Sequence, residues 1–465
     1  MKINTRPFHF GERLLHPQGS TVLWLIQAVF SIVMSLFFRR IELVNSDRIP
    51  KDKGLVFVMN HPNGLIDAAL VFVALPRNVS FLAKSTIFKM PVLGWLAKAV
   101  KALPVYRQSD AKGEMTKNQE TFRQCRELLK NGGAIAIFPE GISHNETKLQ
   151  PLKTGAARIA LGAVSVGQNP SAVDLHVVPV GLFYTNKTDF RSEAMLIFGE
   201  SFPVLPVELN DLGEPTREAV KDLTQEIEDA LLKVTINAED ENALETAHIA
   251  QELFASVYET GDAEQTLADK FEFLRDYVGD SGIEKLSETE ENEKLEKRLA
   301  LYDKKLEKLG IEPENLALPQ YSFGAAAKYF FKRFWFLVLL SPFAIIGTIL
   351  HFPAYQAGKL LAYIYARNES RDIASTVKVL AGMVLMPLTW IIAAVVLYFY
   401  FGWKLALVSL PFTFLCGYVA LRTLEEIDEM RGWIKAAWLF LSGREKFLRL
   451  LAEHRRLYKT VKSKK

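Results

Sequence analysis

The sequence predicts an α/β domain with a mostly parallel sheet flanked by helices, followed by a charged helical insertion and carboxyl-terminal membrane helices. Short β-rich runs alternate with helical patterns between residues 41 and 205, and strands separated by helices favour a parallel sheet. Three apolar runs of 17 to 23 residues then occur between residues 334 and 421. The chain has 465 residues, of which 49% are hydrophobic, enough for more than one domain with a large core.

The charge is divided between two parts of the chain. The net charge is only +3, but residues 239–293 hold 17 Asp or Glu against 3 Lys or Arg, whereas residues 431–465 hold 11 Lys or Arg against 2 Glu. Such asymmetry indicates different surroundings for the two segments.

The cysteines and histidines give no sign of a metal site. Cys125 and Cys416 are far apart in sequence, which implies no disulfide framework and fits a reducing compartment. Several histidines show no paired spacing, and we therefore expect no bound metal; these are His16, His176, His351 and His454.

Residues 1–40 are predicted to hold a membrane-associated helix. Residues 22–38 form an apolar run with arginines on both flanks. The run is short for a membrane span, and cations on both sides resist a simple crossing. We expect a helix that lies in the plane of the membrane or re-enters it. A buried core helix is the alternative.

The α/β domain is predicted for residues 41–235. The expected strands are residues 55–58, 80–82, 134–138, 177–183 and 195–198, and the expected helices are residues 65–75, 116–130 and 154–166. In an open sheet of this class, active groups lie beyond the carboxyl ends of the strands. Two such ends carry polar turns, one at His61 and one at Glu140.

Residues 236–325 are predicted to form an acidic helical insertion. A helical pattern covers residues 224–233 just before it, and a second pattern, over residues 288–309, contains Glu/Lys pairs one turn apart. No chemical motif occurs in this segment, so a solvated helical insertion is the favoured interpretation.

Residues 326–430 are predicted to be the membrane region. Its first apolar segment, residues 334–350, contains Pro342 and Gly347 and is flanked by cations on both sides. By the positive-inside rule both flanks prefer the cytoplasm, and the Pro and Gly permit a bent path. We therefore expect a re-entrant segment here.

The next two apolar segments are expected to form a transmembrane hairpin. Residues 379–401 and 405–421 are separated only by Gly402-Trp403-Lys404, and each is long enough to cross or nearly cross a bilayer. If only this hairpin crosses, the chain is an integral membrane protein whose main domain and tail lie on the cytoplasmic face.

Residues 431–465 are predicted to be a basic amphipathic tail. Trp433, Trp438 and Leu441 lie among its cations, and such a mixture suits the interface of an anionic membrane. Nucleic acid is the rival partner of a basic run. Beside transmembrane segments, anionic lipid is favoured, and we expect no nucleic acid.

The most informative turn is Asn60-His-Pro-Asn-Gly-Leu-Ile-Asp67. It follows a strand-like run and precedes an apolar helical run, so His61 and Asp67 lie around one strand-to-helix turn. A carboxylate on one ring nitrogen fixes the tautomer of an imidazole and leaves the other nitrogen as a base. With no Ser or Cys nucleophile in the turn, the proton to be removed belongs to a substrate. Alone, the pattern is common.

Three downstream motifs add weight, although each has a bland alternative. Arg107 ends the apolar run Ala102-Leu-Pro-Val-Tyr and suits bidentate phosphate binding, but a surface arginine is commoner. Glu140 and Gly141 follow a strand, as in a plain turn. Lys153 precedes a helix amino terminus, which favours anions, without the spacing of a P-loop. His144, near the second motif, could assist acceptor binding, but a polar loop histidine is commoner.

In their order and spacing, the His61 turn and the three downstream motifs resemble the conserved blocks of the glycerolipid acyltransferases of the PlsC type. The strand Val177-Val-Pro-Val-Gly181 looks like that family's fourth block, and the resemblance covers roughly residues 40–235. Three stretches of the chain are most similar to the eukaryotic-type glycerol-3-phosphate/dihydroxyacetone-phosphate acyltransferases. They are Asn60 to Asp67, Phe138-Pro-Glu-Gly and Leu152-Lys-Thr-Gly. One departure is that five residues separate His61 from Asp67, where the commonest family pattern has four.

The resemblance implies a role for each matching residue. His61 would be the catalytic base and Asp67 its orienting carboxylate. The expected substrate-binding residues, chiefly for the phosphate-bearing acceptor, are Asn63, Arg107, Glu140, Gly141 and Lys153. The family uses acyl-CoA or acyl-carrier protein as co-substrate and needs no further cofactor.

The expected function is therefore a membrane-bound O-acyltransferase of phospholipid biosynthesis. The acyl donor would react with a hydroxyl of glycerol-3-phosphate or dihydroxyacetone phosphate, and 1-acylglycerol-3-phosphate (lysophosphatidate) is the alternative acceptor. Two other classes stay open. A lipid hydrolase lacks support because the Gly-x-Ser-x-Gly elbow is absent, and a non-catalytic membrane scaffold would make His61 and Glu140 coincidental.

Overall fold

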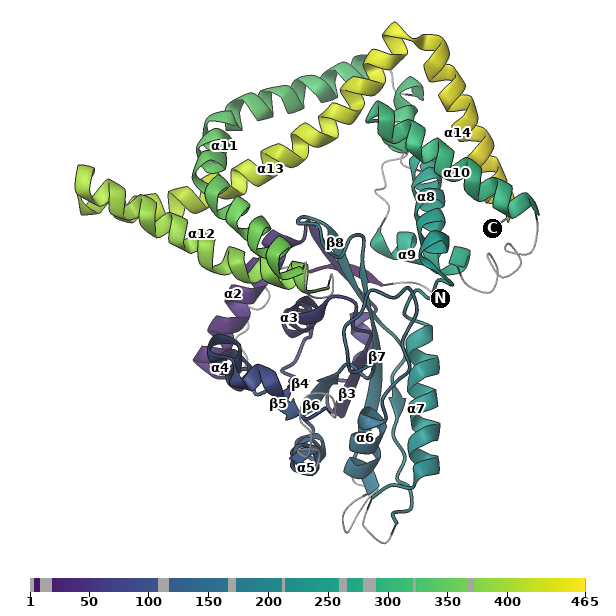
Figure 1. Cartoon of the computed structure of the whole chain (residues 1–465), viewed down its shortest axis with the longest axis vertical. Coiled ribbons are helices and arrows are strands. Elements are labelled where there is room, and N and C mark those ends of the chain that lie inside the picture. The colour runs from purple at the N-terminus through teal and green to yellow at the C-terminus, as the bar shows by residue number, and fades with distance from the viewer. Residues whose placement is uncertain are drawn as a thin grey trace. The chain divides into compact units, whose positions relative to one another are not determined.

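Figure 1 shows the computed structural model of the chain. It describes residues 4–8, 19–107, 117–165, 173–210, 214–258, 266–278, 290–320, 323–366 and 372–464. His16 and the outermost residues of three expected helices, 116, 166 and 288–289, lie outside these ranges. The chain forms two compact units, one of Met1–Asn237 with Glu369–Thr376 and one of Ala238–Asn368 with Val377–Lys465.

The first unit is built on a nine-stranded, mostly parallel sheet. Its strand order is β1-β2-β8-β7-β3-β6-β4-β5, and β9 pairs with β7. The strands are β1 Thr5–Pro7, β2 Arg40–Val44, β3 Gly54–Met59, β4 Ser80–Lys84, β5 Leu103–Val105, β6 Ala134–Ile137, β7 Leu175–Tyr184, β8 Glu193–Phe198 and β9 Phe202–Pro203. Five of the eight pairings are parallel, and the antiparallel ones are β1/β2, β7/β8 and β7/β9. The predicted α/β fold class is confirmed.

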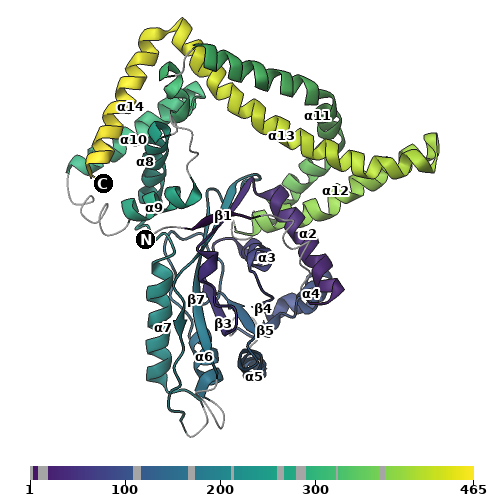
Figure 2. The ribbon, with the colours of Figure 1, turned by 180° about the vertical axis from the view of Figure 1, so that it is seen from behind.

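Helices cover this sheet. They are α2 Thr21–Phe37, α3 Gly64–Ala74, α4 Pro91–Ala99, α5 Lys117–Lys130, α6 Gly155–Ser165 and α7 Arg217–Leu232. In both views α6 and α7 lie side by side, and α2 lies beside α3 (Figure 1, Figure 2). Every residue of β3 and of β6 is buried, as expected for strands whose two faces are both covered by helices.

Helix α2 is amphipathic in its packing. Phe30 and Met34 are among eight buried residues on one side, and Phe30 meets Phe72 of α3 in an edge-on contact with ring centroids 6.3 Å apart. Val22 and Leu25, on the other side, are each more than half exposed. The helix thus joins the core of the first unit and also keeps an apolar outer face. Contact of that face with a membrane stays a prediction.

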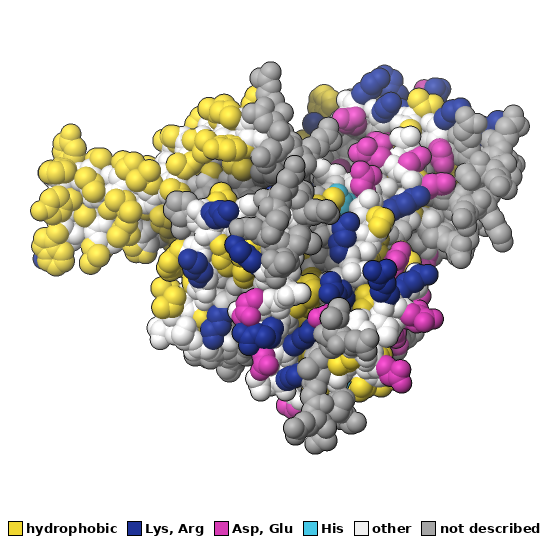
Figure 3. Space-filling model, turned by 60° about the horizontal axis from the view of Figure 1, so that its bottom comes forward, with side chains coloured by type: hydrophobic (Ala, Val, Ile, Leu, Met, Phe, Trp, Pro, Cys, Tyr) yellow, Lys and Arg dark blue, Asp and Glu magenta, His cyan; other side chains and the backbone are white. Residues whose placement is uncertain are grey.

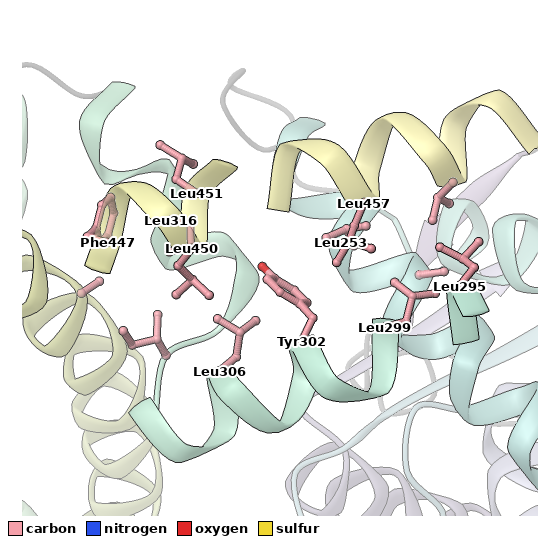
Figure 4. Close-up of a cluster of buried hydrophobic side chains, with 14 of the residues drawn as sticks. Leu253, Leu295, Leu299, Tyr302, Leu306, Leu316, Phe447, Leu450, Leu451 and Leu457 are labelled. Atoms are coloured by element: carbon pink, nitrogen blue, oxygen red, sulfur yellow. The ribbon is translucent and has the colours of Figure 1, made fainter. Parts of the chain in front are cut away.

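The second unit consists of helices. Besides the short 3-10 helix η4 Pro313–Gln320, they are α8 Glu241–Tyr258, α9 Leu267–Val278, α10 Glu290–Leu309, α11 Phe323–Ala366, α12 Asp372–Phe401, α13 Trp403–Ser442 and α14 Arg444–Lys464. The residues of α12 up to Thr376 belong to the first unit. Residues of α8, α10 and α14 share one apolar cluster around Tyr302, Leu299 and Phe447 (Figure 4). The acidic segment and the basic tail therefore meet in a common core, with the apolar face of α14 covered by protein.

Three helices of the second unit are long and apolar enough to cross a membrane. These candidate spans are Phe330–Tyr365, Ser375–Phe401 and Trp403–Ser442. Large apolar side chains lie exposed along them, and Figure 3 shows these side chains gathered at the far end of α12 and α13. Where the sequence suggested a re-entrant segment, the structure has one continuous helix, α11, which carries Pro342 and Pro353 inside it. The extra turns on both sides of residues 334–350 give this helix the length of a span.

The expected hairpin turn is a single glycine. Helix α12 ends at Phe401 and α13 begins at Trp403, with Gly402 between them at a φ of +81°. Helix α13 packs instead against α11, where a Cβ added to Gly347 would lie 2.0 Å from the carbonyl oxygen of Cys416. The backbones of α11 and α13 thus approach as closely as only glycine permits.

Candidate active site

The strand-to-helix turn brings His61 and Asp67 into direct contact. Strand β3 ends at Met59 and α3 begins at Gly64, whose φ of +52° turns the chain into the helix. The Nδ1 atom of His61 lies 2.9 Å from Oδ2 of Asp67. Asp67 is fully buried, and the His61 side chain is 15% exposed. Because a carboxylate can only accept, the proton lies on Nδ1 and the other ring nitrogen, Nε2, remains free to act as a base.

Asp67 is held by three donors. Besides the His61 ring, the backbone N–H of Asn63 donates to Oδ2 over 2.7 Å, and the hydroxyl of Tyr184 donates to Oδ1 over 2.6 Å. Burial and the adjacent carboxylate raise the pKa of Tyr184 well above its ordinary value, so the phenol keeps its proton and donates it. The longer turn between His61 and Asp67 thus still produces a tight contact.

The imidazole is fixed from its flat side as well. The ring of Phe138 stacks on that of His61, with centroids 4.0 Å apart and planes 13° from parallel. Phe138 follows β6, the neighbour of β3 in the sheet. Stacking and the Asp67 contact together define one orientation of the base.

Glu140 joins its own turn to the His61 turn through backbone hydrogen bonds. Its Oε1 accepts the N–H of His61 over 2.8 Å, and its Oε2 accepts the N–H of Gln150 over 2.8 Å and contacts Nε2 of His144. The backbone N–H of His144 in turn donates to the carbonyl of His61 over 3.2 Å. Both oxygens of this buried carboxylate are therefore engaged within the protein, and they position the His61 turn.

Gly141 and Lys153 lie together beside that turn. Gly141 has a φ of +78°, a conformation that suits glycine, and a Cβ added there would lie 3.4 Å from Cγ of Lys153. The N–H of Lys153 donates to the carbonyl of Pro139 over 2.7 Å. The Lys153 side chain is exposed, so its ammonium group is available to an anion next to the Glu140 turn.

Arg107 approaches the same edge of the sheet from another strand. It follows β5, and β3, β6, β4 and β5 are mutually parallel neighbours, so their carboxyl ends share one edge. The residue before it is clamped by Asn118, whose side chain accepts from the N–H of Tyr106 over 2.9 Å and donates to its carbonyl over 2.7 Å. Arg107 itself is partly exposed. The edge thus presents a base and two cations.

Comparisons with known proteins give two family matches. Residues 40–182 match the acyltransferase family, and residues 252–463 match the family described as the glycerol-3-phosphate acyltransferase 2 C-terminal domain. The first unit carries an acyltransferase domain. The four motifs described above all fall within, or at the border of, the first match.

The relatives of the chain include acyltransferases of two acceptor types. An uncharacterized acyltransferase of Schizosaccharomyces pombe is 25% identical over 83% of this chain and 69% of its own length. Glycerol-3-phosphate O-acyltransferase 1 of Saccharomyces cerevisiae is 24% identical over 83% of this chain and 62% of its own. The chloroplastic 1-acyl-sn-glycerol-3-phosphate acyltransferase of Brassica napus is 28% identical over 35% of this chain and 43% of its own. The chain thus spans between about two fifths and two thirds of these relatives.

Asn63 of the acyltransferase domain has a buried side chain. Its Nδ2 donates to the carbonyl of Lys187 over 2.9 Å, and the hydroxyl of Ser375 donates to the same carbonyl over 2.6 Å. Asn63 therefore ties the His61 turn to the loop between β7 and β8. Its role toward a substrate stays a prediction.

Sequence reasoning missed Tyr184 as part of the acyltransferase site and gave His144 an ordinary role. A signal for Tyr184 was present, since it ends β7, which is parallel to β3, and so emerges at the same edge of the sheet as the His61 turn. Asn60 joins the end of β3 to β7. The side chain of Asn60 accepts from the N–H of Leu182 over 2.7 Å and donates to the carbonyl of Leu182 over 3.1 Å. His144 could be found only through the shape of the loop that returns it to Glu140.

Proposed function

We propose that the chain transfers an acyl group from acyl-CoA, or from acyl-carrier protein, to a hydroxyl of glycerol-3-phosphate or dihydroxyacetone phosphate, with His61 as general base. The observation that carries the proposal is the His61–Asp67 pair, with one ring nitrogen held by a buried carboxylate over 2.9 Å at an edge that also bears Arg107 and Lys153. A base beside two cations suits an alcohol that carries a phosphate.

The reaction follows from these groups. Nε2 of His61 takes the proton of the acceptor hydroxyl as that oxygen bonds to the thioester carbonyl carbon. The tetrahedral intermediate then breaks its carbon–sulfur bond, and the leaving thiolate takes the proton back from the imidazolium. The products are an ester and a free thiol. Asp67 stabilises the imidazolium while it exists, and positioned proton transfer of this kind contributes about 10²–10⁴-fold.

Two cations are proposed to hold the acceptor phosphate. The guanidinium of Arg107 can pair with two phosphate oxygens in a fixed plane, and the ammonium of Lys153 adds a second positive charge. Fixing the phosphate places the hydroxyl near the base, and such positioning lowers the barrier by converting an encounter into an intramolecular step.

Glycerol-3-phosphate is favoured over 1-acylglycerol-3-phosphate as acceptor. The match to the glycerol-3-phosphate acyltransferase 2 C-terminal domain covers residues 252–463, the greater part of the second unit. The yeast glycerol-3-phosphate O-acyltransferase aligns with 83% of the chain, whereas the Brassica napus enzyme named for the acylated acceptor aligns with 35%. The second unit is thus shared with the yeast glycerol-3-phosphate O-acyltransferase.

A membrane setting suits the apolar acyl chain and the lipid product. We place the candidate spans of α12 and α13 across the bilayer as a hairpin and the acyltransferase domain on the cytoplasmic face. Two crossings return the chain to the side from which it started, as the common core of α14 with α8 and α10 requires. At the end of α13, Trp438 and Leu441 are 71% and 78% exposed, close in sequence to Arg444 and Lys446. Exposed aromatic and apolar groups beside cations suit contact with anionic lipid.

The test is an acyl-transfer assay on the full chain in membranes, with one labelled acyl-CoA and either glycerol-3-phosphate or 1-acylglycerol-3-phosphate. We expect ester formation with glycerol-3-phosphate and release of an equal amount of thiol. Faster transfer to the acylated acceptor would support the alternative. Release of free fatty acid without any acceptor would indicate a hydrolase.

A further inference from the structure

Asp67 depends on Tyr184 for one of its two oxygens. Within the described residues, Oδ2 accepts from the His61 ring and from the N–H of Asn63, whereas Oδ1 accepts a single hydrogen bond, the one from Tyr184 over 2.6 Å. Asp67 is fully buried, and Tyr184 is 7% exposed. Because Asp67 has no exposed surface, solvent has no direct access to replace a lost donor.

The position of Tyr184 is fixed by the sheet and not by the catalytic turn. It ends β7, whose register pairs Met59 with Val180, so the strand continues for four residues beyond the end of β3 and runs beside the His61 turn. Phe38 stacks on the Tyr184 ring with centroids 5.7 Å apart. A phenol placed so rigidly holds its hydrogen bond without needing to reorient.

We propose that Tyr184 is a positioning residue of the acyl-transfer reaction, which sets the proton affinity of the His61–Asp67 pair through its hydrogen bond to Oδ1 of Asp67. The inference rests on the proposed function of His61 as the base. A donor to a carboxylate withdraws negative charge from it, and a less negative Asp67 attracts a proton on the imidazole less strongly.

Removing the hydroxyl should make the pair bind a proton more readily. Without it, the charge on Asp67 is concentrated and one buried oxygen has no partner, a state that protonation relieves. This holds whether the proton resides on the imidazole or on the carboxylate, because the two groups share one hydrogen bond. Among the residues that the structure describes, Glu140 and His144 are the other titratable groups that bond to the His61 turn; both bond to its backbone and are unchanged by the substitution.

The experiment compares Tyr184→Phe with the wild-type chain in membranes over a range of pH. We expect kcat to fall about ten-fold, the KM for both substrates to change less than two-fold, and the acid limb of the kcat/KM profile to move to higher pH. Replacing Tyr184 with 3-fluorotyrosine, a stronger donor that retains the ring and the bond, should move the limb to lower pH. That second variant keeps the test decisive if Tyr184→Phe does not fold.

Tyr302→Phe is the matched control. Tyr302 is 1% exposed and its hydroxyl bonds to Nδ1 of His454 over 2.7 Å, in the second unit. Like Tyr184→Phe, Tyr302→Phe removes one hydroxyl oxygen from a buried tyrosine. We expect it to leave the acid limb of the kcat/KM profile in place. In the Asp67→Asn background, Tyr184→Phe should change kcat less than two-fold, because its effect passes through the carboxylate.

The outcomes distinguish a failure of the inference about Tyr184 from a failure of the proposed function. If His61→Ala keeps full activity, the proposed function fails. If His61→Ala is inactive but both Tyr184 variants keep the wild-type acid limb, the function stands and the role of Tyr184 is overturned. An acid limb that moves equally in Tyr302→Phe would also overturn it.

Discussion

The carboxylate of Glu140 accepts the backbone N–H of His61 over 2.8 Å, across 79 residues of sequence. The two motifs are thus joined at the main chain, and the imidazole ring is left to Asp67. Because both oxygens of Glu140 are occupied and its side chain is fully buried, its chief action is to hold the turn that carries the base.

Glu140→Gln should lower both activity and stability. The amide retains an acceptor for His61, but its NH₂ group faces the N–H of Gln150, so two donors oppose each other. Leaving a buried donor unsatisfied costs about 1–3 kcal/mol, and we expect a matching fall in unfolding free energy together with a lower kcat. Glu146→Gln, in the exposed part of the same loop, is the control. If Glu140→Gln changes only the KM for the acceptor, Glu140 binds substrate instead.

Gly141→Ala should destabilise the same turn. The backbone at Gly141 has a φ of +78°, where a side chain costs about 1–2 kcal/mol, and the new Cβ would press on Lys153. Gly155→Ala is the control, because nothing lies within 4 Å of its added Cβ. Thermal unfolding of the two variants should therefore differ, with Gly155→Ala near wild type. Equal melting points would mean that the turn adapts freely.

Arg107→Lys should weaken acceptor binding while sparing the chemical step. A lysine keeps the charge but loses the planar pair of donors, and a charged hydrogen bond is worth about 1.5–3 kcal/mol. We expect the KM for glycerol-3-phosphate to rise about ten-fold or more, with kcat changed far less. Arg123→Lys, on the exposed face of α5, should leave both constants alone. An unchanged KM in Arg107→Lys would place the phosphate elsewhere.

The fold class and the His61–Asp67 pair could be predicted because both follow from local sequence. The pair lies within one turn, and the strands around it are short runs of apolar residues between Gly and Pro. Strand β2 was missed because Arg40 and Glu42 interrupt its apolar pattern. Tyr184 lies 117 residues from Asp67, so only strand order reveals it.

In the second unit, the sequence did not predict what covers the apolar side of each helix. Helix α14 was expected as part of a basic tail on lipid, yet Phe447, Leu450 and Leu457 pack against α8 and α10. Each of these helices has an apolar stripe that needs a partner, and no local pattern says whether the partner is lipid or protein. Cations such as Arg449 stay exposed on the outer side of α14, and their contact with lipid stays a prediction.

The stability of the second unit should depend on pH through His454. Burial lowers the pKa of His454 to about 4, and its nitrogens contact Tyr302 and Ser256. Unfolding restores an ordinary value near 6.5, so the unfolded chain binds the extra proton first. The contribution of about 3 kcal/mol is complete above pH 6.5 and is lost as the pH falls to about 4.

Thermal unfolding of the chain in detergent between pH 7 and 4 checks this. His454→Gln should be less stable at pH 7 and should lose less stability on acidification than wild type. Parallel pH dependence in the two proteins would show that other groups govern acid unfolding.

Gly347→Leu should disrupt the packing of α11 on α13. The backbone of Cys416 leaves no space for a side chain at Gly347, whereas nothing lies within 4 Å of a Cβ added at Gly382 of α12. We expect Gly347→Leu to reduce the amount of folded protein extracted from membranes and Gly382→Leu to match wild type. Equal yields would argue against the close approach of the two helices.

The most direct test of the central claim is acyl transfer to glycerol-3-phosphate by His61→Ala in membranes, beside His176→Ala, a partly buried histidine of the same unit that contacts Lys53 and Asp174. We predict that His61→Ala loses at least 10²-fold in kcat at an unchanged melting temperature, while His176→Ala remains active. Substantial transfer by a folded His61→Ala protein would contradict the assignment of the base.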